Sequence, residues 1–425
     1  MLDTKAFYLP EEIRNQDYLL ATYYMRLPKG EDVIRRAVKF ANGQTLGTWV
    51  EVPGITSEMC ERYMGRVVRI YDAPPCDLST QRLDPFVDYF VQLAFPRVNV
   101  GAGFPGMLTM LLGNDASTSS QAKLVDLQFS DAALDSFAGP RFGIEGLRKA
   151  TGVYDRPLVL SMIKPCTGLT PEQGAEIFYK VACGGADIVK DDELLGSTEF
   201  SRPADRVRAF AKAGEAAYQQ TGSRTIYAVN ITDTASRLMD NLSAVLDAGA
   251  KAVMINVAAI GYSQAQQVAE SCPVPLLGHY AGAGMFYEGV VSGMSSPLAV
   301  GRLPRLCGVD MQVINTPYGG YPLEHQKYLQ QVHELTLPLR GIKPCMPIIG
   351  GGVHPGVVWR YTEEVGIDMI LGTGGAIHGH PQGAEAGTRA MIAAARCAAA
   401  GISPEEAAAQ SPELRAAFAA FGAPQ

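Results

Sequence analysis

The sequence predicts an α/β protein with a C-terminal (β/α)8 TIM barrel and an N-terminal α+β domain. Short apolar segments alternate with helical ones in the second part of the chain, and polar or glycine-rich residues follow most of these segments. With 425 residues, 47% of them hydrophobic, the chain can bury the cores of two domains. We place the N-terminal domain at residues 1–145 and the barrel, with a helical tail, at 146–425.

The N-terminal part mixes the two kinds of periodicity. Residues 18–27, 66–71 and 89–95 are rich in β-branched and aromatic residues, whereas residues 30–42 have helical spacing. Strands and helices in this order predict an α+β domain.

Eight apolar segments predict the strands of the barrel. Because both faces of a barrel strand are covered, such strands are nearly continuously apolar. The segments are 157–163, 187–189, 225–230, 252–256, 275–278, 311–314, 347–349 and 368–371. After residue 383 the chain is alanine-rich, and Ser403-Pro404-Glu405-Glu406 has the cap, proline and early acidic charge that start a helix.

Charge and cysteine usage exclude several classes of protein. A net charge of −7 argues against a nucleic-acid partner, which needs a basic surface. Eight cysteines without CxxC pairs argue against zinc ribbons and disulfide scaffolds. We see no signal peptide and no long apolar run, so we expect a cytoplasmic protein with reduced thiols and no membrane partner.

A lysine and three carboxylates, Lys190, Asp191, Asp192 and Glu193, end the second segment. On an extended strand Lys190 and Asp192 point one way and Asp191 the other, and Glu193 can rejoin them where the strand ends. Two carboxylates suit Mg²⁺, so the lysine beside them has to be a counter-ion, a deprotonated base or a modified ligand. The simpler interpretation is a solvated turn.

Other polar residues end the neighbouring segments. The first segment ends at Lys164, the third at Asn230 and Thr232, the fourth at Asn256 and the fifth at His279. The seventh and eighth segments end in glycine-rich stretches, residues 350–352 and 372–375. In such barrels catalytic groups lie at the C-terminal strand ends, with a phosphate site after strands seven and eight. Glycines there allow backbone NH groups to approach an anion.

These motifs resemble the ribulose bisphosphate carboxylase (RuBisCO) large-chain superfamily. The resemblance rests on Lys190-Asp191-Asp192-Glu193 and extends through segments 139–146, 163–165, 227–232, 278–279 and 379–381. It implies a Mg²⁺ held by Asp192, Glu193 and a Lys190 carbamylated by CO₂.

The resemblance also implies roles for other residues. Lys164 would transfer a proton, with a lowered pKa, and His279 would contact substrate oxygens. Asn114 would reach the site of a partner subunit, which implies a homodimer or a multiple of dimers. The residues that match one phosphate site are Thr48, Trp49, Gly352, Gly374 and Gly375.

Departures from the carboxylases indicate the non-fixing, RuBisCO-like form IV branch. Residues 315–320 lack the lysine that carboxylases carry after strand six, and Tyr280, Val313 and Gly350 replace three groups that help to bind a bisphosphate. The resemblance therefore implies enediolate chemistry on a monophosphorylated keto compound rather than CO₂ fixation.

Several enediolate reactions stay open. We favour decarboxylation of a phosphorylated 3-oxo sugar acid, of the 3-oxo-isoapionate 4-phosphate type. The alternatives are the methylthioribulose 1-phosphate isomerase and the diketo-methylthiopentyl phosphate enolase of methionine salvage, and a non-catalytic binding or regulatory member. Segments 316–319 and 352–356 resemble the enolases, but Asn114 stands where those enolases have a base lysine.

Four further polar residues have no assigned role. We do not expect Cys166 to be a nucleophile, because no adjacent base is identifiable. We interpret His354, His378 and His380 as structural, since their spacing does not require a metal.

Overall fold

The computed structural model describes residues 6–13, 16–47, 52–78, 82–101, 103–320 and 322–424. Its contacts divide the chain into two compact units, Met1–Phe137 with Ala283–Ala299, and Ala138–Gly282 with Val300–Gln425. We retain the limits 1–145 and 146–425 as a proposal for the N-terminal α+β domain and the barrel with its helical tail. No helix in the described ranges is long and apolar enough to cross a membrane.

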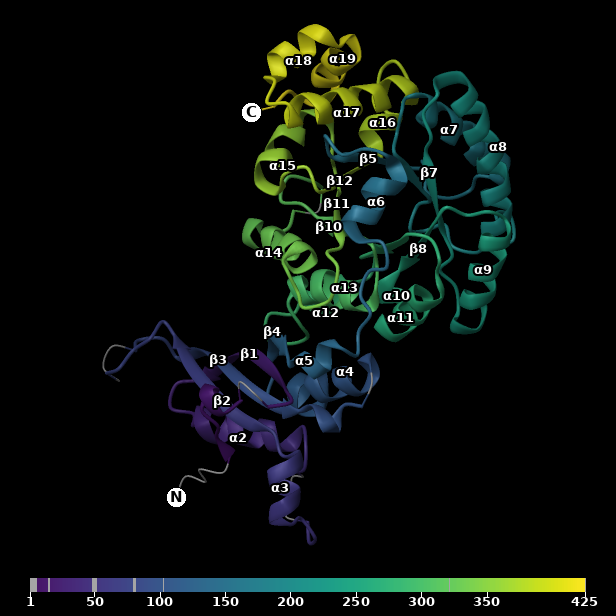
Figure 1. The fold of residues 1–425 in the computed structure, drawn as a ribbon. Helices are drawn as coiled ribbons and strands as arrows, with labels where there is room; N and C mark the ends of the chain where they lie inside the picture. Colours follow the sequence, from purple (N-terminus) through teal and green to yellow (C-terminus); the bar gives the residue numbers. More distant parts are fainter. Residues whose placement is uncertain are drawn as a thin grey trace. The chain divides into compact units, whose positions relative to one another are not determined.

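The first unit contains an antiparallel sheet with the strand order β2-β3-β1-β4 (Figure 1). Its strands are β1 (Tyr18–Pro28), β2 (Arg66–Ala73), β3 (Phe86–Pro96) and β4 (Lys123–Phe129). Its helices are α1 (Pro10–Ile13), α2 (Val33–Gly43), α3 (Ser57–Tyr63), α4 (Phe104–Leu112), α5 (Asp131–Leu134) and α12 (Gly284–Tyr287). The sequence analysis predicted the first three strands and α2 but missed β4.

The second unit is a closed barrel of eight parallel strands, which confirms the predicted fold class. The strands are β5 (Leu158–Met162), β6 (Ile188–Lys190), β7 (Ile226–Asn230), β8 (Ala252–Asn256), β9 (Leu276–His279), β10 (Met311–Asn315), β11 (Met346–Gly350) and β12 (Ile370–Thr373). Each lies at a predicted segment. Alternate residues point inward and form one core that includes Leu160, Ile188, Met254, Leu277 and Val313.

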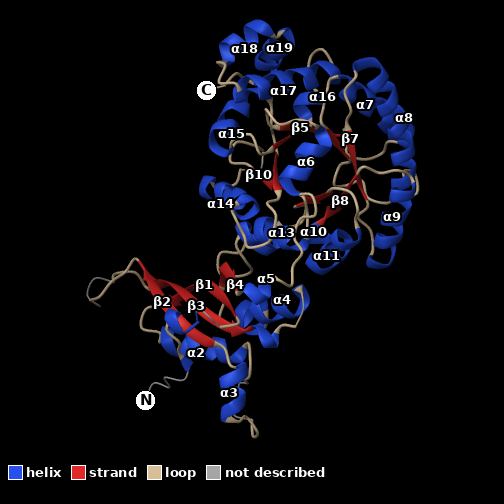
Figure 2. Ribbon diagram, viewed as in Figure 1, coloured by secondary structure: helices blue, strands red, loops and turns tan. Residues whose placement is uncertain are grey.

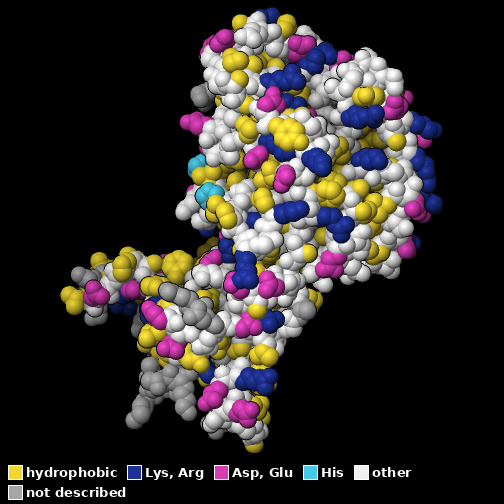
Figure 3. All heavy atoms as spheres, in the orientation of Figure 1, with side chains coloured by type: hydrophobic (Ala, Val, Ile, Leu, Met, Phe, Trp, Pro, Cys, Tyr) yellow, Lys and Arg dark blue, Asp and Glu magenta, His cyan; other side chains and the backbone are white. Residues whose placement is uncertain are grey.

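Helices surround these strands (Figures 1 and 2). They are α6 (Gly143–Thr151), α7 (Pro171–Cys183), α8 (Pro203–Thr221), α9 (Ala235–Asp247), α10 (Val257–Ile260), α11 (Tyr262–Ser271), α13 (Leu303–Cys307), α14 (His325–Thr336), α15 (Val358–Val365) and α16 (Gly375–His378). Charged side chains stand on the outer surface of this layer (Figure 3). This distribution is typical of helices that bury one face against a sheet.

The chain ends in helices α17 (Ala384–Ala399), α18 (Pro404–Gln410) and α19 (Pro412–Phe421). The Ser403 side chain accepts a hydrogen bond from the Glu406 N–H, so the predicted cap of α18 is present. Helix α17 packs against α7, α15 and α19, and its alanines and glycine allow these close approaches.

Candidate active site

Five of the residues singled out in the sequence lie together at the C-terminal ends of the barrel strands. Lys190 is the last residue of β6, with Asp192 and Glu193 directly after it, His279 ends β9, and Lys164 follows β5. Ile188 and Leu277, two residues earlier on β6 and β9, point into the barrel core. Strand alternation therefore directs Lys190 and His279 inward just above that core.

Lys164 is bound to the carboxylate of Asp192. Its Nζ lies 2.6 Å from Asp192 Oδ2 and 3.0 Å from Cys166 Sγ. Burial lowers the pKa of Lys164, but the hydrogen bonds and charges of Asp192 and Cys166 outweigh burial, so the net pKa is raised. The lowered pKa expected from the sequence is therefore wrong for this arrangement, because Asp192 stabilises the ammonium form.

Lys190 is buried beside Glu193. Its Nζ donates to the carbonyl oxygen of Asp191 at 2.9 Å and to Glu193 Oε2 at 3.4 Å, and the side chain is 1% exposed. Burial lowers the pKa of Lys190 more than the charges of Glu193 and Asp192 raise it. Burial thus favours the neutral amine, the form that can react with an electrophile.

His279 approaches Glu193 from the opposite side. Its Nε2 lies 3.4 Å from Glu193 Oε2, and its Nδ1 accepts a hydrogen bond from the Ala281 N–H at 3.0 Å. Burial, with the charge of Lys190, lowers the pKa of His279 well below its usual value. The ring is therefore neutral, and the acceptor role of Nδ1 places the proton on Nε2.

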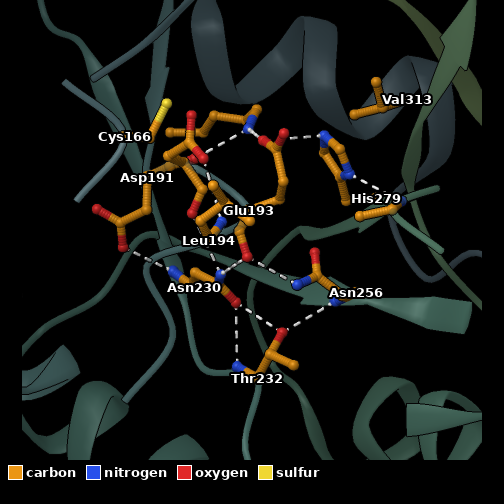
Figure 4. Close-up of polar contacts among 12 residues, drawn as sticks. Cys166, Asp191, Glu193, Leu194, Asn230, Thr232, Asn256, His279 and Val313 are labelled. Atoms are coloured by element: carbon orange, nitrogen blue, oxygen red, sulfur yellow. Dashed lines mark hydrogen bonds and ion pairs between the residues drawn. The ribbon is translucent and has the colours of Figure 1, made fainter. Parts of the chain in front are cut away.

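The main chain at Glu193 is held by two asparagines, as Figure 4 shows. The Asn230 amide donates to the carbonyl oxygens of Asp192 and Glu193, both at 3.3 Å. The Asn256 amide donates to the Glu193 carbonyl at 2.9 Å. Thr232 completes the group, donating to Asn230 Oδ1 at 2.6 Å and accepting from the Asn256 N–H at 2.9 Å.

Asp191 points away from this group, as the alternation predicted, and is fully paired. It accepts hydrogen bonds from Arg206 Nε at 3.0 Å, Tyr227 Oη at 2.5 Å and the Asn230 N–H at 2.8 Å. The sequence analysis missed Arg206 and Tyr227 as supports of the site. A buried carboxylate on the far side of the strand was itself a signal, because it requires a donor or a cation on a covering element.

The glycines expected at a phosphate site end β11 and β12. Gly352 has φ +96°, a conformation that favours glycine. A Cβ on Gly374 would lie 2.8 Å from Met162 Cγ and 3.3 Å from Lys164 Cε, whereas one on Gly375 would meet no atom within 4 Å. Gly374 thus packs closely beside the Lys164 side chain, and the space at Gly375 is open.

The three site residues predicted in the N-terminal part are Thr48, Trp49 and Asn114. Thr48 and Trp49 lie outside the described residues. Asn114 belongs to the first unit and is exposed just before the one-turn helix Asp115–Ser119.

The three histidines that we interpreted as structural make such contacts. His378 Nε2 lies 2.9 Å from the Met162 carbonyl oxygen, and His380 Nε2 lies 3.0 Å from that of Glu413. His354 Nδ1 accepts from the Gly356 N–H at 3.2 Å and caps a short helix.

The side chains of this group have to match the oxygen donors that the expected Mg²⁺ prefers. Within the described residues no three His, Cys, Asp or Glu side chains are grouped to hold a metal ion. Asp192 and Glu193 supply two carboxylates, and the Lys190 amine donates to the Asp191 carbonyl oxygen and to Glu193 Oε2. The residues fit Mg²⁺ if Lys190 becomes a carbamate, because the third oxygen donor then stands on that side chain.

The fold agrees with the comparisons with known proteins. Models of the ribulose bisphosphate carboxylase large chain match residues 7–133 (N-terminal domain) and 143–421 (catalytic domain). The chain belongs to this family, whose enzymes use Mg²⁺ and a carbamylated lysine.

Two relatives extend over most of the chain. A ribulose bisphosphate carboxylase-like protein of Archaeoglobus fulgidus is 38% identical over 385 residues, which cover 90% of this chain and 88% of the relative. A 2,3-diketo-5-methylthiopentyl-1-phosphate enolase of Bacillus pumilus is 33% identical over 407 residues, covering 95% and 98%.

Solved structures give the same result. A RuBisCO-like protein (MtnW) of Alicyclobacillus acidocaldarius has a TM-score of 0.88 at 35% identity, covering 96% of this chain and 100% of that one. The dimeric archaeal RuBisCO of Hyperthermus butylicus has a TM-score of 0.85 at 28% identity, covering 98% of each. The chain is therefore a RuBisCO-like member of the family, as the sequence predicted.

Proposed function

We propose that this protein is a Mg²⁺-dependent enolase that acts on a phosphorylated diketone of the 2,3-diketo-5-methylthiopentyl-1-phosphate type. The observation that carries the proposal is the hydrogen-bonded group of Lys164, Asp192, Lys190, Glu193 and His279 at the mouth of the barrel. Proton-transfer and metal-ligating side chains that converge at strand ends are what enolisation requires.

The comparisons favour the enolase over decarboxylation. The Bacillus pumilus relative is named for the enolase, and the Archaeoglobus fulgidus relative is named for no activity. These relatives give no support to the decarboxylation of a phosphorylated 3-oxo sugar acid, which the sequence analysis favoured. The methylthioribulose 1-phosphate isomerase and a non-catalytic role are likewise without support from them.

Asp192, Glu193 and a carbamylated Lys190 are the residues that would hold Mg²⁺. Bound there, Mg²⁺ would polarise a substrate carbonyl and stabilise the negative charge that develops on its oxygen. The low exposure of Lys190 and Asp192, both 1%, keeps bulk water from these groups. Burial also lowers the pKa of Lys190, which favours the neutral amine that can combine with CO₂.

Lys164 is the proposed proton carrier. Its Nζ can take the proton from the carbon next to the carbonyl once Asp192 no longer stabilises the ammonium. Asp192 as a metal ligand would no longer stabilise the Lys164 ammonium, which would lower the pKa of Lys164. Asn114, which stands where the resembling enolases have a base lysine, has no basic group and cannot perform this step. We therefore assign the step to Lys164.

His279 and the glycines would position the substrate. The neutral His279 ring presents its Nε2–H and can donate a hydrogen bond to a substrate oxygen. Gly352, Gly374 and Gly375, with Thr48 and Trp49, are the proposed phosphate-binding residues.

The segment after β10 argues against carboxylation. It contains no lysine from Asn315 to Gly320. The hydroxyl of Tyr318 donates to Glu364 on α15, and the guanidinium of Arg360 lies 4.7 Å from the centre of the Tyr318 ring. We infer that these contacts hold the segment on α15.

We also propose that the protein is a homodimer or a multiple of dimers. The support is the family membership and the dimeric RuBisCO of Hyperthermus butylicus, which matches over 98% of the chain.

The test is proton NMR in D₂O with Mg²⁺, bicarbonate and 2,3-diketo-5-methylthiopentyl 1-phosphate. We expect enol formation with deuterium exchange at the carbon next to the carbonyl, lost in Lys164→Met and in Lys190→Met. Lys212→Met removes an exposed lysine of α8 and should leave the rate unchanged. The proposal fails if exchange is absent in the wild type, or if CO₂ is released from a phosphorylated 3-oxo acid instead.

A further inference from the structure

Asn256 has a hydrogen-bonding group that the protein itself does not use. Its Nδ2 donates to the Glu193 carbonyl oxygen at 2.9 Å, which identifies that end of the amide as the nitrogen. Its Oδ1 is therefore the carbonyl oxygen, and this atom is buried without a hydrogen-bond partner. The residue as a whole is only 8% exposed.

The position of Asn256 directs this oxygen into the mouth of the barrel. Ala252 and Met254, at alternate positions on β8, belong to the barrel core, so Asn256 also points inward. Asn256 pairs with His279 on the neighbouring strand β9. Figure 4 shows the amide oxygen of Asn256 turned toward the side of Glu193 and His279.

Asn230 shows that an asparagine at a barrel strand end does not have to leave its amide oxygen free. Asn230 also ends a barrel strand and also donates to the Glu193 carbonyl. Its Oδ1, however, accepts hydrogen bonds from the Thr232 N–H and hydroxyl, at 3.0 Å and 2.6 Å. The same side chain at two equivalent strand ends is thus satisfied by the protein in one case and left open in the other.

A second free acceptor lies on the other side of His279. Asn315 ends β10, in line with the core residues Met311 and Val313, and its Oδ1 is buried without a partner. A buried acceptor without a donor has lost its hydrogen bonds to water and gained none from the protein, which is unfavourable. Two of them on strands that flank His279 indicate that a ligand supplies the donors.

We propose that Asn256, aided by Asn315, is a substrate-binding residue that accepts a hydrogen bond from a hydroxyl group of the ligand. The inference rests on the proposed function, since it concerns the ligand of the same site. A 2,3-diketone carries no hydroxyl on its carbon chain. A donor appears there only when the carbon next to the carbonyl loses a proton and the carbonyl oxygen gains one.

Asn256 would therefore bind the enol more strongly than the diketone, and an interaction made late in the reaction accelerates it. A hydroxyketone substrate would instead gain the same contact in the ground state. The subsite thus selects for hydroxyl-bearing ligands whichever keto phosphate is the natural substrate.

The experiment compares the binding of two probes of equal chain length, ribitol 5-phosphate and n-pentyl phosphate, to the full-length protein with Mg²⁺ and bicarbonate. Isothermal titration calorimetry is done on the wild type, Asn256→Ala and Asn256→Ser. Asn241→Ala is the matched control, because Asn241 on α9 donates to the Ile231 carbonyl and to Asp233 rather than into the barrel mouth.

We expect the wild type to prefer ribitol 5-phosphate and Asn256→Ala to lose about tenfold in affinity for it alone, the usual effect of one hydrogen bond. Asn256→Ser should lose less, and Asn241→Ala should match the wild type. Equal losses for both probes would mean a structural role and would overturn the proposal. So would a wild type that binds the two equally or binds neither.

Failure of the enolase proposal is distinguishable from failure of this one. If the preference for ribitol 5-phosphate depends on Asn256 but the protein does not turn over the diketone, the subsite proposal is supported and the enolase proposal is wrong. If the protein turns over the diketone but Asn256→Ala keeps the wild-type ratio of affinities for the two probes, the enolase proposal is supported and the subsite proposal is wrong.

Discussion

Removing the guanidinium of Arg206 should strongly destabilise the protein. Arg206 Nε donates to Asp191 Oδ2 at 3.0 Å, and its Nη2 donates to the carbonyl oxygens of Gly196 at 3.1 Å and Asn230 at 2.9 Å. The side chains of Arg206 and Asp191 are 2% and 1% exposed. Arg206→Met fills most of the volume but leaves a buried carboxylate without its cation.

The expected loss in free energy of unfolding is about 3 kcal/mol. Breaking a buried ion pair by removing one partner costs about 3–5 kcal/mol. The lower end applies here, because Asp191 keeps the hydrogen bonds from the Tyr227 hydroxyl and the Asn230 N–H.

Urea unfolding followed by circular dichroism measures this loss. Arg208→Met is the matched control on the same helix, since the ion pair of Arg208 with Asp205 has side chains 61% and 52% exposed. Such a pair contributes little, so the control should change the free energy by less than about 0.5 kcal/mol.

The double variant tests the physical reason. Combining Arg206→Met with Asp191→Asn removes the uncompensated charge, so the two losses should be non-additive by about 1–3 kcal/mol. Additive losses, or an Arg206→Met variant as stable as the Arg208→Met control, would refute the reasoning.

Three further predictions concern the site. Gly374→Ala places a Cβ 2.8 Å from Met162, so it should lower stability by about 1–3 kcal/mol and reduce turnover. Gly375→Ala meets no atom within 4 Å, so it should leave the melting temperature unchanged and raise KM. Equal melting temperatures of the two variants would contradict this prediction. Because the pKa of His279 is lowered on folding, the unfolded state binds the proton first, and stability should fall as the pH drops below about 6.5, by about 1.4 kcal/mol at pH 5.5. His279→Gln should reduce this loss of stability between pH 7.5 and 5.5, as measured by urea unfolding at both pH values. An equal loss in the variant and the wild type would contradict the prediction. Lys190→Met should abolish bicarbonate-dependent Mg²⁺ binding in calorimetry, and retained binding would exclude the carbamate.

The barrel could be predicted because its strands are specified locally. Each is a short apolar run covered on both faces, and each predicted segment contains part of a strand. Strand β4 was missed because only Leu124 and Leu127 of its residues are buried and its pairing with β1 is irregular. Ala283–Ala299 gave no local sign that it joins the first unit, where Lys123 Nζ donates to the carbonyl oxygens of Tyr287 and Gly289.

The sequence by itself determined which charged side chains share the mouth of the barrel, because strand alternation and the parallel fold direct strand ends to one side. Only the tertiary structure decided the state of those side chains. Lys164 meets Asp192, which raises its pKa, and Arg206 reaches Asp191 from a later helix. Charge states depend on which groups come within a few ångströms and on how far water is excluded, and both are set by contacts between residues distant in the chain.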